Sequence, residues 1–113
     1  MKRFLERDLG WTTLSARTVG HSISYLMKDP TGKHLATMEL KPEGSITVTI
    51  GNETRIVPGL EDISKTLNLN KKAALDSQKR LLYQVLERLI RNHRDESQVD
   101  IEDMMERFSR GKL

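Results

Sequence analysis

The spacing of apolar residues changes halfway along the chain. In the first half, apolar and polar side chains alternate, which is the period of strands with one buried face. The clearest case is Ile46, Val48 and Ile50, which alternate with threonines. After Gly59, apolar residues recur every three or four positions, as they do along one face of an α-helix. The pattern therefore predicts an α+β fold, with strands first and helices second.

Turn residues mark where the strands end. Asp29-Pro30-Thr31-Gly32 combines a side-chain acceptor, a residue of fixed φ and a glycine that accepts a left-handed conformation. This combination predicts a hairpin between a strand over residues 22–28 and a strand over residues 33–40. Gly51-Asn52 is a turn pair of the kind that joins short hairpins, and Pro58-Gly59 ends the sheet. We therefore expect an antiparallel β-meander of four or five strands.

The N-terminal residues predict a short helix followed by the first strand. Residues 1–9 place apolar side chains at helical spacing, and Gly10 suits the position after a helix end. From Trp11 the residues favour a strand. In that strand, Leu14 and Ala16 are expected to share one side of the pleat, and Trp11 to take the other.

The second half predicts a short helix, a long helix and a C-terminal helix. Leu60–Leu67 fits a helix of two turns, residues 68–70 interrupt it, and Asn70 can cap a long helix that runs to about Asn92. The apolar side chains of the long helix cover an arc of about 200° around its axis. An arc this wide indicates two contacts, of which the sheet is one.

The C-terminal helix, over residues 100–110, is a candidate for the second contact. Its apolar stripe recurs at helical spacing and consists of Ile101, Met104, Met105 and Phe108. If this helix folds back, the stripe is core; otherwise the second side of the long helix meets another copy of the protein. A methionine-rich terminal helix also suits an irregular groove on a partner. We favour the core interpretation, because the long helix needs a cover.

Composition excludes several classes of protein. The 113 residues suit a single domain, with residues 1–58 forming mainly the sheet and residues 59–113 the helices. The absence of cysteine excludes disulfides, a thiol nucleophile and thiolate metal sites. No stretch approaches the ~18 apolar residues of a membrane span, and charges interrupt the N-terminus before a signal peptide could form. We therefore expect a cytoplasmic protein that does not contact a membrane.

The sequence contains no motif of catalysis or cofactor binding. His21, His34 and His93 are scattered and have no second ligand at helical spacing, so no metal site is predicted. Gly44-Ser45 lacks the second glycine of a nucleophile elbow, and no phosphate-binding or dinucleotide-binding glycine loop occurs. We predict a non-catalytic binding module without a metal or small-molecule cofactor. An enzyme whose acid and base come from remote positions is the third hypothesis.

Charge is uneven along the chain, whose formal net charge is +3. Residues 71–94 carry seven basic and two acidic side chains, whereas residues 95–113 carry three basic and six acidic ones. A basic segment of this kind attracts polyanions, unless the neighbouring acidic segment neutralises it. The short helix, the break at residues 68–70 and the start of the long helix also fit a helix-turn-helix, whose second helix meets phosphates and base edges.

We therefore predict nucleic-acid binding with a regulatory role. The main contacts are expected at the start of the long helix and the auxiliary phosphate contacts further along it: Lys71, Lys72, Lys79 and Arg80, then Arg88, Arg91 and Arg94. Two residues depart from the usual helix-turn-helix pattern and weaken this interpretation. Asn68 stands where glycine usually eases the turn, and Ser77 stands where an apolar contact is expected. The pairs Asp76–Arg80 and Glu87–Arg91 have i,i+4 spacing, which favours an ordinary solvated face.

The alternative hypothesis is a protein–protein interaction module, either a homodimer or an inhibitor-like adaptor. It would use the wide apolar arc of the long helix and the stripe of the last helix, Ile101, Met104, Met105 and Phe108. The two hypotheses differ in one accessible observable. Binding to nucleic acid weakens steeply with salt, whereas association through apolar faces does not.

Overall fold

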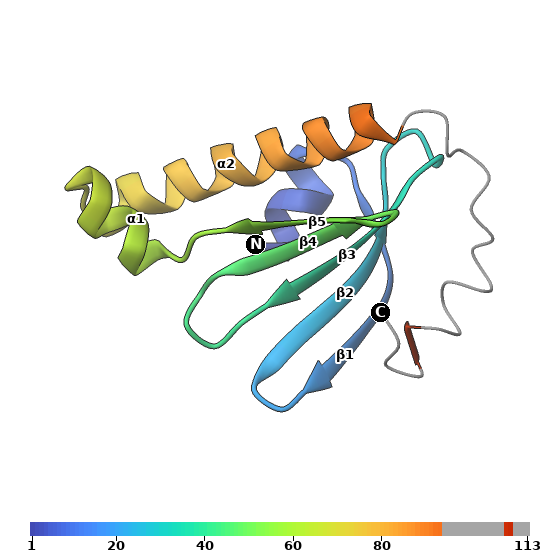
Figure 1. Ribbon diagram of the computed structural model, residues 1–113, viewed down its shortest axis with the longest axis horizontal. Helices are drawn as coiled ribbons and strands as arrows, with labels where there is room; N and C mark the ends of the chain where they lie inside the picture. The colour runs from blue at the N-terminus through green and yellow to red at the C-terminus, as the bar shows by residue number, and fades with distance from the viewer. Residues whose placement is uncertain (94–107, 110–113) are drawn as a thin grey trace.

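The structure is a computed structural model that describes residues 1–93 and 108–109, and it has the predicted α+β architecture (Figure 1). Five antiparallel strands form a meander, so their order in the sheet is their order along the chain. The strands are β1 (Thr12–Val19), β2 (Ser22–Lys28), β3 (Leu35–Leu40), β4 (Ile46–Ile50) and β5 (Glu53–Val57). Within residues 1–93, one π-helical turn, η1 (Phe4–Asp8), precedes the strands and two helices follow them, α1 (Leu60–Leu67) and α2 (Lys71–Asn92).

The turns form where the sequence predicts them. In the β2–β3 hairpin the carbonyl of Asp29 accepts the N–H of Gly32 at 3.0 Å, and Gly32 takes the left-handed φ of +74° that favours glycine. β4 buries Ile46, Val48 and Ile50 and leaves its threonines half-buried. The predictions of this hairpin and of the β4 alternation are therefore confirmed.

α2 and the N-terminal segment share one face of the sheet, here called the inner face (Figure 1). Leu82 and Leu86 of α2 meet inward side chains of the strands such as Met38, and all three are at most 2 % exposed. Leu5 of η1 and the neighbouring Trp11 belong to the same cluster. The N-terminal segment therefore supplies the second contact that the wide apolar arc of α2 required.

The opposite, outer face of the sheet holds a second and smaller cluster. Phe108 packs there against Leu26 and Leu35, and its side chain is 2 % exposed. Leu26 lies between Tyr25 and Met27, which point to the inner face, so Phe108 covers the outer face rather than the second side of α2. Residues 100–107 and 110 of the predicted last helix lie outside the described residues.

β1 departs from the predicted alternation. Its register with β2 shifts between Thr13 and Ser15, which places a bulge at Leu14. Leu14 packs against the outer cluster, whereas Ala16 lies opposite Tyr25, whose side chain belongs to the inner cluster. The prediction that Leu14 and Ala16 share one side of the pleat is wrong, because the extra residue of the bulge shifts the alternation.

The helix boundaries agree with the sequence. Asn68 follows α1 with a left-handed φ of 53°, which asparagine accepts more readily than most residues. Asn70 then caps α2, since its side-chain oxygen accepts the N–H of Ala73 at 2.8 Å. Leu67, an apolar residue of α1, is 54 % exposed and borders an open hollow beside Leu81.

Candidate nucleic-acid interface

One buried polar side chain fixes the position of α2 on the sheet. Gln78 is 3 % exposed, and its amide nitrogen donates to the carbonyl oxygens of Gly44 at 3.1 Å and Pro58 at 3.0 Å. These carbonyls belong to the β3–β4 and β5–α1 connections, so one side chain ties the helix to two loops. Because both amide hydrogens find acceptors, the amide nitrogen is buried without losing its hydrogen bonds. The two bonds also set which side of α2 faces outward.

The structure places six of the seven predicted nucleic-acid contacts on α2, and the seventh, Arg94, lies outside the described residues. Five side chains are exposed: Lys71, Lys72, Arg80, Arg88 and Arg91. Lys79 is half-buried, and its Nζ lies 5.5 Å from the centre of the Phe4 ring. In Figure 1, α2 runs along one border of the described part of the molecule.

The exposed basic residues do not form a single stripe. At 3.6 residues per turn, Arg80 and Arg91 project away from the sheet, and Lys72 and Arg88 lie on the two flanks. We call these four residues the outward face of α2; they span about 29 Å of helix. Lys71 instead lies toward α1, where it lines a hollow of about 640 Å³ with Glu43 and Glu61, among others.

The predicted ion pairs along α2 are absent from the described residues. No side-chain N–O contact within 4.0 Å joins Asp76 to Arg80 or Glu87 to Arg91 in that part of the chain. Two arginines, Arg88 and Arg91, line a shallow depression of about 420 Å³ together with Glu87. The guanidinium groups of the outward face therefore keep their donors available to a ligand.

Of the four residues predicted for protein interaction, only Phe108 lies among the described residues. Ile101, Met104 and Met105 lie outside the described residues. Phe108 is buried, and the guanidinium carbon of Arg17 lies 5.3 Å from the centre of its ring. This ring is therefore covered within the chain and offers no surface to a partner.

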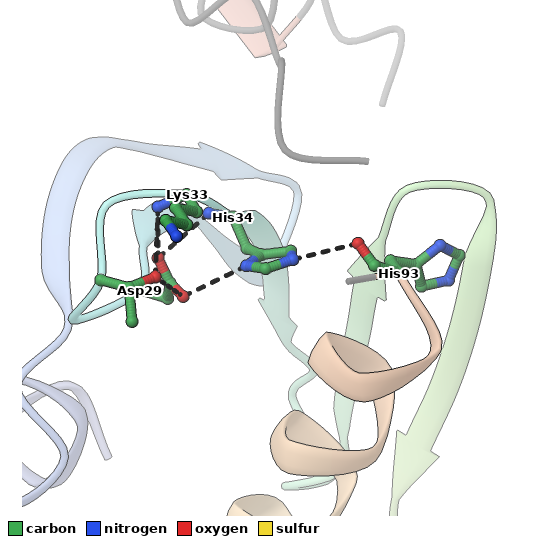
Figure 2. A network of polar contacts seen from close by, with 5 residues as sticks. Asp29, Lys33, His34 and His93 are labelled. Carbon is green, nitrogen blue, oxygen red and sulfur yellow. Dashed lines mark hydrogen bonds and ion pairs between the residues drawn. The ribbon is translucent and has the colours of Figure 1, made fainter. Parts of the chain in front are cut away.

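A buried polar network, which the sequence analysis missed, ties the C-terminus of α2 to the β2–β3 hairpin (Figure 2). Asp29 accepts the N–H groups of Lys33 at 2.9 Å and His34 at 3.0 Å, and the Thr31 hydroxyl at 2.7 Å. Nδ1 of His34 lies 3.3 Å from the Asp29 carboxylate, and Nε2 lies 3.0 Å from the carbonyl oxygen of His93. Because both partners are acceptors, an imidazole protonated on both nitrogens satisfies them together.

The Asp29–His34 pair resembles the carboxylate–imidazole half of a catalytic triad, but its geometry is structural. Nε2 of His34 faces a backbone carbonyl, where a triad would place a nucleophile. His34 is 6 % exposed and Asp29 is 3 % exposed, so both residues are buried in the described structure. The only sequence signal for the pair was the turn that brings residues 29 and 34 together.

Glu53 makes a second connection to the end of α2. Its carboxylate accepts Asn92 Nδ2 at 3.0 Å and lies 3.4 Å from Nε2 of His93, while Arg55 binds its other oxygen at 2.9 Å. Hydrogen bonds from Asn92 and Arg55 hold the pKa of Glu53 below its ordinary value. The β2–β3 and β4–β5 hairpins therefore both hold the C-terminal end of α2.

The Asp29 network makes the free energy of unfolding depend on pH in the acidic range. Burial raises the pKa of Asp29, but the N–H of His34, the Thr31 hydroxyl and the His34 ring outweigh it, so the pKa is lower than usual. A carboxyl whose pKa is lower in the folded state contributes stability above its unfolded pKa of about 3.9, and this contribution is lost as pH falls. We expect the parent to lose more stability between pH 7 and pH 3 than Asp29→Asn, in urea unfolding followed by circular dichroism. Asp8→Asn, at an exposed aspartate, is the control, and an equal loss in parent and Asp29→Asn would contradict the assignment.

Comparison with known proteins adds no further constraint, since no family model, no curated protein and no solved structure matches the chain. Among the described residues, no three His, Cys, Asp or Glu side chains gather into a site for a metal ion. None of the described helices is both long and apolar enough to cross a membrane. Function must therefore be inferred from geometry and charge.

Proposed function

We propose that the protein binds nucleic acid through the outward face of α2, as a non-catalytic module with a regulatory role. One observation carries this proposal: Lys72, Arg80, Arg88 and Arg91 are exposed and unpaired with carboxylates within the described residues, on a helix held rigidly from behind. α2 as a whole carries six basic and two acidic side chains. A fixed array of cations releases counterions from a polyphosphate when it binds, which favours association.

The geometry favours contacts to phosphates over readout of base edges. A recognition helix enters the major groove with its first turns, which must protrude from the domain. Here the first turns of α2 are anchored on their inner side by Ala74 and Gln78, and Lys71 lies toward the α1 hollow. The outward side chains point away from the sheet, but the helix backbone itself does not protrude from the domain. Binding by this face would therefore depend weakly on sequence.

The salt dependence of binding tests the proposal on the parent protein. Four phosphate contacts predict a slope of log K against log salt of about −3.6 on duplex DNA and about −2.8 on a single strand. Anisotropy of a labelled oligonucleotide, titrated with protein over a series of salt concentrations, measures this slope. No binding at low salt to duplex DNA, single-stranded DNA or RNA would exclude the proposal.

A protein-interaction module is the second candidate, and one observation favours it. Leu67 is 54 % exposed and lines a hollow of about 460 Å³ between α1 and α2, together with Pro58, Ile63 and Leu81. Exposed apolar side chains around a hollow are typical of sites where a partner side chain inserts. Light scattering separates the candidates, because self-association at this hollow gives a mass above the 13.0 kDa of one chain even at high salt.

A further inference from the structure

An exposed aromatic ring lies beside two of the basic residues of α2. Among the large apolar side chains exposed in the described part of the chain, Tyr83 is the only aromatic one, and it is 43 % exposed. Lys79 and Arg80 precede it by one helical turn, so the ring and the two cations are neighbours on the helix surface. At helical spacing, Tyr83 lies at the margin of the apolar arc of α2.

The ring borders a small apolar hollow built from three separate segments. α2 contributes Tyr83, Leu86 and Ile90, the linker after η1 contributes Leu9 and Trp11, and the β2–β3 turn contributes Pro30. The hollow has a volume of about 230 Å³, and Trp11 in its wall is 5 % exposed. Its lining suits a flat group with an apolar face. Glu87 also lines the hollow, and its carboxylate would repel a phosphate.

We infer that this site takes an unpaired base of single-stranded nucleic acid, which stacks on Tyr83 at the mouth of the hollow. The inference rests on the proposed function and names the class of nucleic acid that the same surface prefers. A single strand offers a flat π-face beside a phosphate on each side, so the base meets Tyr83 while the backbone meets Lys79 and Arg80. A duplex keeps its bases stacked inside and offers only phosphates to the same surface.

Tyr83→Ala, compared with Tyr83→Trp, tests the inference. The parent should bind a single-stranded oligonucleotide more tightly than the duplex of the same sequence at equal salt. Tyr83→Ala should weaken single-strand binding by about tenfold or more, the effect of losing one stacked base, and change duplex binding less than twofold. Tyr83→Trp should retain single-strand binding, because it keeps a stacking surface. Trp11 fluorescence should change with the single strand and not with the duplex, since Trp11 lines the hollow.

The outcomes separate this inference from the proposed function. If neither nucleic acid binds at low salt, both fall. If both forms bind with a steep salt dependence but Tyr83→Ala leaves the single-strand preference unchanged, or no preference exists, the stacking site is wrong and phosphate binding stands. If Tyr83→Ala weakens duplex and single-strand binding equally, the ring acts on the helix and not on a base. Circular dichroism of each variant verifies that the fold is intact. If Tyr83→Ala is unfolded, Tyr83→Trp still tests the inference by itself. Equal affinities of a folded Tyr83→Trp for duplex and single strand would overturn the inference.

Discussion

Leu82→Ala is expected to lower the free energy of unfolding by about 2–5 kcal/mol, the cost of removing a buried leucine side chain and leaving a cavity. Leu82 is 0 % exposed and lies where α2, η1 and the strands meet in one cluster. The truncation therefore opens a cavity inside this cluster, and the surrounding sheet leaves little room for collapse. Urea unfolding monitored by circular dichroism measures the change.

Gln84→Ala is the matched control on the same helix. Gln84 is exposed two residues further along, so its truncation should alter the free energy of unfolding by no more than about 0.5 kcal/mol. If Leu82→Ala lowered the free energy of unfolding by less than about 1 kcal/mol, the buried position of Leu82 would be contradicted. Removing a side chain buried to this degree from a close-packed core costs more than that.

Replacing the four basic residues of the outward face by glutamine is expected to lower affinity for duplex DNA by about four-thousandfold at 0.1 M salt. Each phosphate contact contributes about a factor of eight at this salt concentration relative to 1 M salt, because the slope per contact on duplex DNA is about 0.9. The variant is Lys72→Gln, Arg80→Gln, Arg88→Gln and Arg91→Gln combined. These side chains are exposed, so the fold should be retained.

A control with the same net charge separates the outward face from a general field effect. Four exposed basic residues lie outside α2, on the N-terminal segment, the β2–β3 turn and α1: Arg3, Arg7, Lys33 and Lys65. Their combined replacement by glutamine should weaken binding by less than about tenfold, because long-range attraction is screened beyond about 10 Å at 0.1 M salt. Equal losses in the two variants would show that net charge, and not the outward face, governs binding.

Local signals in the sequence were sufficient to predict most of the fold. The Asp29–Gly32 turn, the alternation of β4 and the Asn70 cap each act within a few residues, so they can be read without knowing the tertiary structure. The bounds of α1 and α2 followed from the same kind of signal. The basic residues of α2 could also be named in advance, because helical spacing determines which side chains share a face.

What could not be predicted depends on contacts between distant residues. Gln78 had no predicted role, and only the positions of the Gly44 and Pro58 carbonyls explain its burial. The bulge at Leu14 depends on the register with β2. Tyr83 had no predicted role, because the hollow that it borders is completed by residues more than fifty positions earlier in the chain, among them Trp11 and Pro30.

An NMR titration of isotope-labelled protein with a single-stranded oligonucleotide at low salt tests most directly whether nucleic acid binds the outward face of α2. The predicted result is that the largest shifts fall on the side-chain Nε signals of Arg80, Arg88 and Arg91 and on the amides of α2 around them. The amides of Thr37 and Thr47 on the outer face of the sheet should not move. Shifts concentrated on the sheet, or no shifts in a folded protein, would contradict the account.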